Sequence, residues 1–345
     1  MKEHLTLSKE ELQELFKKAE KFRGLDPWQW LVEDDIFAVK FQNMEETIIC
    51  SVLGSKGGAR GIAFYVGGDG IESYFRLHEG RYDQQLEQIH ITDSFVLYFD
   101  EVSKNEEGDS ILLMNSGIDF GRDKELPIFR RNEPGYVPRV LVGDELELVS
   151  RILSVVNYGI EVEGLLIDLQ NRRLKIEKKC PVVKVNIDGK YVNTLLSYEC
   201  LKQECIESIN KPRPKPCDEL MLKRISKSYE SSHYILEMDY FNYGVGVDDE
   251  GRPYFPAVLL IVDEGTNIVG YQITQPDLAE EAWQQYMIEW IKEKKILPYK
   301  MILRNKTLYK YLKGILSGLG IKVELRQKLD NIPAIKKQYF SNRII

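Results

Sequence analysis

Residues 234–241, Tyr-Ile-Leu-Glu-Met-Asp-Tyr-Phe, and residues 257–262, Ala-Val-Leu-Leu-Ile-Val, decide the fold of the last third of the chain. The second stretch is continuously apolar, which is typical of a strand that is covered on both faces of a sheet. A turn at 263–267 then leads into a third predicted strand at 268–273. Asp239 falls near the middle of the first strand, where a charge is costly to bury unless a metal or another cation compensates it.

Toward the C-terminus the pattern changes from strands to an alternation of helices and strands. A helix is predicted at about 278–292, a strand at 300–303, a helix at 308–316 and a strand at 321–325. Gly318 and Gly320 end the second helix. This order predicts that residues 218–345 form an α/β domain with a mixed sheet and covering helices.

Toward the N-terminus, residues 161–217 are predicted to be a hairpin-rich connector. Asp188-Gly189 between two valine-rich runs is a turn signal. Residues 210–216, Asn-Lys-Pro-Arg-Pro-Lys-Pro, favour an extended backbone without hydrogen bonds and are predicted to be a linker.

Residues 1–160 are predicted to form an α+β domain. Ser8 and Glu11 make a capping box that begins the first helix. Strands are predicted at 36–41, 47–53, 62–66 and 95–99, with a helix at 71–77 and an amphipathic helix that begins at Asp144. The segment between residues 100 and 138 is expected to be irregular.

The end of that irregular segment, residues 127–138, carries prolines, aromatic residues and two arginines. We expect Phe129 and Tyr136 to be buried and to hold a rigid loop against the first domain. The functional alternative is an anion-binding site formed by Arg130 and Arg131.

Composition narrows the class of function. The 345 residues carry a net charge of −7 with interleaved signs, so charge does not support nucleic acid as a partner, although it does not exclude one. No run of about 18 uncharged apolar residues occurs, so no membrane association is expected. The five cysteines and the charged first residues predict reduced thiols in a cytoplasmic protein.

Familiar cofactor motifs are absent from the sequence. The glycines at 54–61 lack the Gly-Lys-Ser/Thr ending of a phosphate-binding loop, and those at 67–70 are more simply a bulge or a turn than an anion site. Cys200, Cys205 and Cys217, with His233 as a distant fourth ligand, could hold zinc, but structural thiols fit the spacing better. No cofactor is expected.

Acidic residues at the ends of predicted strands give the sharpest site hypothesis. Asp239 and Asp263 on neighbouring strands could form a divalent-metal site, with Asp248 or Asp249 as a further ligand. The simpler alternative is that Asp239 faces solvent and Asp263 opens a turn.

The order of elements over about residues 230–330 resembles the ribonuclease H-like fold of integrase and transposase cores. The resemblance implies that Asp239 stands where the first catalytic Asp is found, and that 258–273 is the hairpin that follows. Arg304, however, stands in place of the second Asp, with Asn305 beside it, and too little chain follows Leu325 for a helix that presents a third carboxylate. An arginine there would repel metal ions, so the resemblance implies a catalytically degenerate domain.

The whole chain also resembles uncharacterised bacterial proteins that pair two domains of unknown function. The features shared with the first domain include residues 50–54, 65–71 and Pro134-Gly135-Tyr136-Val137-Pro138. Those of the second include Arg252-Pro253-Tyr254-Phe255-Pro256 before the apolar strand. This resemblance implies a domain arrangement and no activity.

Three functions remain open. The first is a non-catalytic binding or regulatory protein with a protein or small-molecule partner. The second is a divergent nuclease or phosphoryl-transfer enzyme that uses Mg²⁺ or Mn²⁺ at Asp239 and Asp263. The third is a small-molecule sensor. If the first holds, Asp239 and Arg304 should lie close enough to form a bidentate ion pair, whereas an outward-facing Arg304 would leave Asn305 as a polar ligand.

Overall fold

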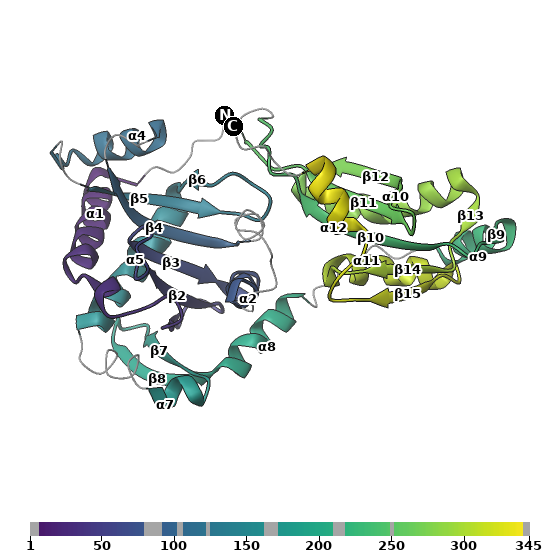
Figure 1. Cartoon of the computed structure of the whole chain (residues 1–345). Coiled ribbons are helices and arrows are strands. Elements are labelled where there is room, and N and C mark those ends of the chain that lie inside the picture. Colours follow the sequence, from purple (N-terminus) through teal and green to yellow (C-terminus); the bar gives the residue numbers. More distant parts are fainter. Residues whose placement is uncertain are drawn as a thin grey trace. The chain divides into compact units, whose positions relative to one another are not determined.

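The computed structural model describes residues 7–78, 92–101, 106–121, 125–161, 172–209, 218–248 and 252–340. Contacts divide the chain into two compact units (Figure 1). Of the described residues, those from 7 to 133 and from 138 to 209 belong to unit 1, and those at 134–137 and from 218 to 340 belong to unit 2. Within the described ranges, no helix combines the length and the apolar composition that crossing a bilayer requires.

Unit 1 is built on an eight-stranded mixed sheet in the order β6-β5-β4-β3-β2-β1-β7-β8. All neighbours are antiparallel except β1 and β7. The strands are β1 (Phe37–Phe41), β2 (Thr47–Leu53), β3 (Gly61–Val66), β4 (Ser94–Glu101), β5 (Glu125–Asn132), β6 (Arg139–Val140), β7 (Lys179–Val185) and β8 (Tyr191–Ser197). The helices are α1 (Lys9–Gly24), η1 (Pro27–Gln29), α2 (Gly67–His78), α4 (Glu107–Ser116), α5 (Gly143–Glu161), α7 (Arg172–Ile176) and α8 (Tyr198–Ile209).

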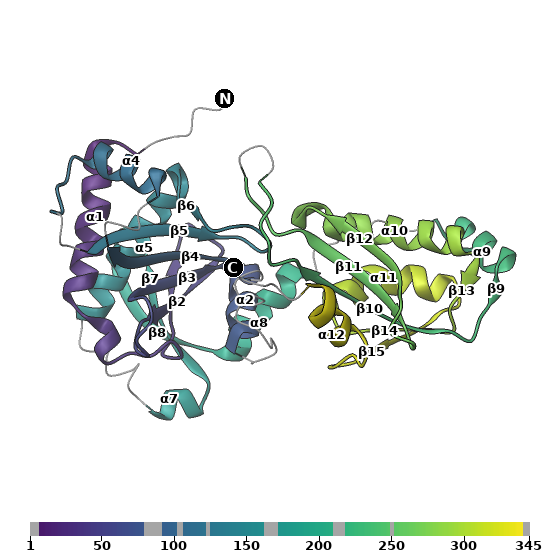
Figure 2. The same cartoon turned by 45° about the horizontal axis from the view of Figure 1, so that its top comes forward.

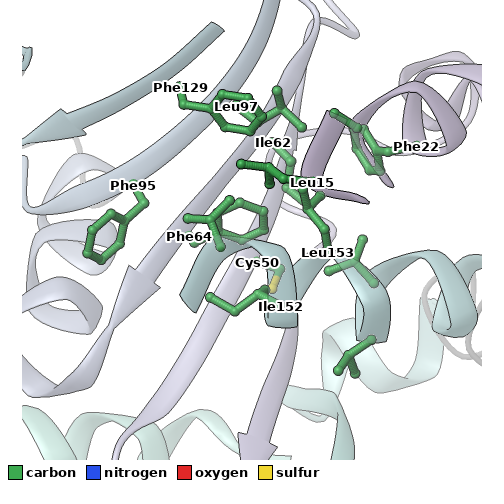
Figure 3. Close-up of a cluster of buried hydrophobic side chains, with 14 of the residues drawn as sticks. Leu15, Phe22, Cys50, Ile62, Phe64, Phe95, Leu97, Phe129, Ile152 and Leu153 are labelled. Carbon is green, nitrogen blue, oxygen red and sulfur yellow. The ribbon is translucent and has the colours of Figure 1, made fainter. Parts of the chain in front are cut away.

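Helices cover both faces of this sheet. On one face α1 and α5 pack on the central strands, where Phe22, Phe64 and Ile152 belong to a large apolar cluster (Figure 3). On the other face α2 and α8 enclose a smaller cluster. Burial on both faces explains why β1 to β3 are apolar at nearly every position.

The predicted start of α1 is confirmed, since the Ser8 hydroxyl accepts from the Glu11 N–H and the Glu11 carboxylate accepts from the Ser8 N–H. The start of α2 differs from the prediction, because the glycine run from Gly67 forms its first turn instead of a bulge. A Cβ at Gly70 would lie 2.9 Å from the carbonyl carbon of Tyr65. The glycine therefore permits the close approach of helix and strand.

Two parts of the sequence prediction for unit 1 are wrong. The segment expected to be irregular contains α4 and β5, and β5 includes Pro127. Proline is tolerated there because, among the described residues, β5 pairs with β6 only at Arg130 and Arg131, so Pro127 has a strand neighbour on one side, β4. The hairpin around Gly189 is present, but its strands β7 and β8 extend the sheet beside β1 and do not form a separate connector.

Unit 2 is built on a five-stranded mixed sheet in the order β12-β11-β10-β14-β15. Strand β10 (Ile235–Asn242) is central, antiparallel to β11 (Ala257–Asp263) and parallel to β14 (Lys300–Leu303). The remaining strands are β12 (Ile268–Thr274), β15 (Lys322–Leu325) and the short pair β9 (Glu230–Ser231) and β13 (Ile296–Leu297). The helices are α9 (Glu219–Ser228), η3 (Pro276–Leu278), α10 (Ala279–Lys294), α11 (Lys306–Gly318), α12 (Ile332–Ile335) and the π-helix η4 (Lys336–Phe340).

Opposite faces of this sheet carry different layers. The main core, with Met238 of β10, lies under α9, α10 and α11. The other face carries Leu260, Val262 and Ile302, which belong to one apolar cluster with Ile332 and Ile335 of α12. The position of α12 beside the sheet can be followed in Figure 2. The chain after Leu325 forms α12 and η4, and neither of these short helices contains an acidic residue that could serve as a third carboxylate.

Candidate functional site

A buried carboxylate on the central strand of unit 2 forms the candidate site. Side chains alternate along a strand, so Glu237 and Asp239 of β10 lie on the same face as the layer formed by α12. Glu237 is 4% exposed and Asp239 is 1% exposed. The simpler alternative, in which Asp239 faces solvent, is therefore wrong. The charge of Asp239 must be compensated inside the protein.

Two cations compensate the charge of Asp239. Its Oδ2 lies 3.1 Å from a guanidinium nitrogen of Arg304, which follows β14, and 3.3 Å from Nζ of Lys336. The parallel register that pairs Met238 with Leu303 brings Asp239 and Arg304 to the same level of the sheet. The predicted proximity is thus confirmed, but the ion pair uses one carboxylate oxygen instead of the bidentate geometry expected.

The second oxygen of Asp239 is left in an unusual state. Its Oδ1 is buried and has no hydrogen-bond partner among the described residues. Lys336 lies with Nζ 4.0 Å from the ring centroid of Phe241, so its position is set by an aromatic ring as well as by the acid. The cluster therefore places two positive charges against one carboxylate, of which only one oxygen is engaged.

Glu237 holds the start of α12 against the same sheet face. Its carboxylate accepts backbone hydrogen bonds from Asp330, Asn331 and Ile332, at 2.8, 2.8 and 3.0 Å. A negative charge at a helix N-terminus satisfies free N–H groups and is stabilised by the peptide dipoles. Asp330, the remaining acidic residue near the chain end, contributes its backbone here and has its side chain 3.5 Å from Arg326.

Asp263 lies away from this cluster. Antiparallel pairing sets Asp263 opposite Leu236, three residues before Asp239 on β10. At 3.3 Å per residue, the two acids are therefore about 10 Å apart along the strand direction. The Asp263 carboxylate accepts from the side-chain amide and the backbone N–H of Asn267, and these bonds lower its pKa. The structure therefore does not bring Asp239 and Asp263 together, and Asp263 stabilises the turn that follows β11.

The other predicted ligands are also engaged in local structure. Asn305 caps α11, since its Oδ1 accepts from the N–H of Leu308 at 3.0 Å. Asp248 is exposed, and Asp249 lies outside the described residues. In the part of the chain that the structure describes, no three His, Cys, Asp or Glu residues are grouped to hold a metal ion.

The arginines of unit 1 are committed to acids. Arg130 makes a bidentate pair with Asp109, at 2.6 and 2.7 Å. Burial opposes the charge of Arg130, but the hydrogen bonds and the charge of Asp109 outweigh it and raise the pKa. Arg131 pairs with Asp93 at 2.5 Å and lies over the Phe95 ring. Neither arginine is presented as an anion site.

The aromatic residues of the same segment separate. Phe129 is 1% exposed and belongs to the core of unit 1, as predicted. Tyr136 is half-buried and belongs to unit 2 with residues 134–137, so the expectation that it holds the loop against the first domain is wrong.

The thiols give no sign of a zinc site in the described residues. Cys205 is buried on α8, while Cys200 is exposed and accepts from Ser197 through a weak contact at 3.2 Å. Cys217 lies outside the described residues. Burial raises the pKa of Cys205 to about 12, which disfavours the thiolate that a metal requires.

Sequence reasoning missed two members of the cluster, Glu237 and Lys336. A signal for Glu237 was present, because acids at positions i and i+2 of a central strand share one face. No sequence signal marks Lys336, since its role depends on how α12 returns to β10.

Comparisons with known proteins match both parts of the chain. Residues 13–162 match the family model described as Domain of unknown function (DUF7309), and residues 221–340 match that of Domain of unknown function (DUF6930). The expected pairing of two domains of unknown function is thus confirmed. The search of curated proteins found no match.

Among solved structures, one similar chain comes from "Crystal structure of the Mos1 Strand Transfer Complex". The identity is 11% and the TM-score is 0.20, with 53% of this chain and 68% of that chain covered. A similarity at this level carries no argument about fold or function.

Proposed function

We propose that the protein acts by binding and not by metal-dependent catalysis, and that unit 2 is a ribonuclease H-like domain without a working metal site. The arrangement of β10, the antiparallel strands β11 and β12, helix α10 and the parallel strand β14 supports the fold assignment. The acid of the first strand, Asp239, supports it as well.

One observation carries the loss of catalysis: Arg304 and Lys336 occupy the surroundings of Asp239. A site for two divalent ions needs several carboxylates around ions about 4 Å apart. Here a single buried carboxylate faces two cations, and Glu237 is already bound to three backbone N–H groups. Like charges would repel an incoming divalent ion.

A binding role for the whole chain is consistent with its charge. The net charge of −7 favours a protein or a small molecule over nucleic acid as the partner. The two matched family models do not suggest an activity that would contradict a binding role, because both describe domains of unknown function.

A divergent metal-dependent nuclease or phosphoryl-transfer enzyme is the second candidate, and one observation favours it. The buried Oδ1 of Asp239 lacks a partner among the described residues, and an unpaired carboxylate oxygen is a ligand for Mg²⁺ or Mn²⁺. Binding there would require Arg304 or Lys336 to move aside.

Titration calorimetry with Mn²⁺ separates the two functions. The full chain, the Asp239→Asn variant and the Asp263→Asn variant are compared, the last as a carboxylate control outside the cluster. We expect no micromolar binding that depends on Asp239. Micromolar binding by the wild type that is lost in Asp239→Asn and retained in Asp263→Asn would overturn the proposal and show a metal site of the kind that the enzyme requires.

A further inference from the structure

Two proline-rich motifs that lie far apart in the sequence pair with each other inside unit 2. Tyr136 of the segment 134–137 forms an antiparallel bridge with Tyr254 of the segment 252–256. The N–H of Val137 donates to the carbonyl of Pro253 at 3.1 Å, and the N–H of Phe255 donates to the carbonyl of Gly135 at 2.8 Å. The shorter segment is thus bound as an added strand.

The receiving segment is itself held in place by unit 2. Tyr254 exchanges two backbone hydrogen bonds with Val247, at 2.7 and 2.9 Å, on the side away from Tyr136. The side-chain amide of Asn242 donates to the carbonyl of Phe255 at 3.0 Å. Segment 252–256 is therefore the middle of three short strands, and segment 134–137 is the outer one.

Gly135 is the position at which the fit is most demanding. Its φ is +81°, a region that favours glycine, and the residue is buried. A Cβ at this position would lie 2.5 Å from Cβ of Pro276 and 2.8 Å from Nδ2 of Asn242. A side chain at this point would be strained and would force Pro276 or Asn242 to shift, so the surface favours glycine here.

Two side chains of the receiving segment contact Tyr136, the residue that follows Gly135. The guanidinium carbon of Arg252 lies 3.7 Å from the centroid of the Tyr136 ring, and the rings of Tyr136 and Tyr254 meet edge to face at 6.4 Å. A cation over an aromatic face and an edge-to-face ring pair both require an aromatic residue. The surface is selective for an aromatic residue after the glycine.

The bound segment is attached at the periphery of the unit. None of the residues 134–137 or 252–256 belongs to the four apolar clusters found among the described residues, and Tyr136 and Val137 are only half-buried. Main-chain bonds with a few side-chain pockets are the usual means by which proteins bind extended peptides reversibly.

We propose that the surface formed by Arg252–Phe255 with Asn242 and Pro276 is a peptide-binding site. The chain occupies this site with its own Gly135-Tyr136-Val137, and a partner protein binds by presenting an extended Gly–aromatic–β-branched segment that displaces it. The proposal deepens the binding role proposed above and rests on it, but the contacts that carry it do not involve the Asp239 cluster.

A peptide of residues 132–140, labelled with fluorescein, tests the site by fluorescence anisotropy. The full-length variant Gly135→Val should lose its own segment from the surface and bind the peptide saturably. The affinity of the wild type for the peptide should be lower by at least about tenfold. The peptide can bind only those molecules in which the chain's own segment has left the surface. Gly57→Val is the matched control, since Gly57 has a φ of +83° but open space around it.

Specificity variants complete this experiment. Replacing Gly with Val or Tyr with Ala in the peptide should abolish binding, and Arg252→Ala in the Gly135→Val background should weaken it. Equal affinity of the Gly135→Val and Gly57→Val variants, or no saturable binding to either, would overturn the proposal.

Hydrogen exchange on the wild type gives a readout that does not depend on how Gly135→Val folds. Excess unlabelled peptide should accelerate exchange at the N–H of Val137 and leave that of Phe255 protected, because the peptide replaces one strand with another. If the protection of the Val137 N–H stayed unchanged at every peptide concentration, the peptide would not displace the chain's own segment, and the proposal would be contradicted. No metal is present in these experiments, so their failure would leave the conclusion about Asp239 untouched, and the manganese result leaves the peptide site untouched.

Discussion

Each unit buries an acidic side chain beside an arginine, and the two sites differ in how many of the carboxylate oxygens have a partner. In unit 1, Arg130 binds both carboxylate oxygens of Asp109. A carboxylate oxygen of the exposed Glu106 lies 3.3 Å from a guanidinium nitrogen of Arg130. In unit 2, one oxygen of Asp239 meets both Arg304 and Lys336 while the other lacks a partner among the described residues. A saturated pair is typical of a structural role, whereas a buried carboxylate oxygen without a partner requires a separate explanation.

The largest effect is expected from breaking the saturated pair. Arg130→Met leaves the carboxylate of Asp109 buried without a counter-charge, which should lower the free energy of unfolding of unit 1 by about 3–5 kcal/mol. Chemical denaturation measures the loss. Lys21→Met, which removes an exposed pair with Glu161, should cost less than about 1 kcal/mol. A similar cost for both variants would remove the distinction.

A smaller effect is expected at Glu237. Glu237→Gln keeps the size of the side chain but replaces one acceptor oxygen with a donor that faces the N–H groups before α12. We expect a loss of about 2 kcal/mol, as for hydrogen bonds to a charged group. Hydrogen exchange at residues 330–332 should accelerate, and unaltered exchange there would contradict the anchoring role.

Asp239→Asn tests the unsaturated cluster directly. The amide oxygen can still accept one hydrogen bond, and the side chains of Arg304 and Lys336 are 29% and 18% exposed, so both can turn toward water. We expect a loss of about 1 kcal/mol in the free energy of unfolding. A loss equal to that of Arg130→Met would show that the two clusters are energetically alike and would break the comparison.

The surface network at β15 sets the lower end of the scale. Hydrogen bonds from Arg326, and then from Lys300, lower the pKa of Glu324 from its ordinary value of 4.5 to about 2. Because the folded pKa is depressed, the stabilisation is present above pH 4.5 and is lost as the pH falls through about 2.

Carboxyl-carbon NMR follows this titration. Glu324 should remain ionised at about pH 3.5, where an ordinary glutamate is mostly protonated. Arg326→Met should move the midpoint upward, and a midpoint near 4.5 in the wild type would contradict the network.

Much of the candidate site was predictable because it depends on strand order. The apolar run at 257–262 and the turn after Asp263 identify a hairpin, and the helix that follows makes the next strand parallel to the first. Asp239 and Arg304 then fall at the same level of the sheet without further information. The error at Asp263 arose because antiparallel pairing sends its strand end away from Asp239.

What the sequence by itself determined are the elements whose pattern is local: the capping box at Ser8, the apolar strands and the turn at Gly189. Only the tertiary structure decided which partners these elements meet. It placed β7 beside β1, returned Lys336 to Asp239 and set Gly135 against Pro276. Local patterns follow from backbone sterics and from periodicity between neighbouring residues. Contacts between distant segments depend instead on how whole surfaces pack, which no short stretch of sequence records.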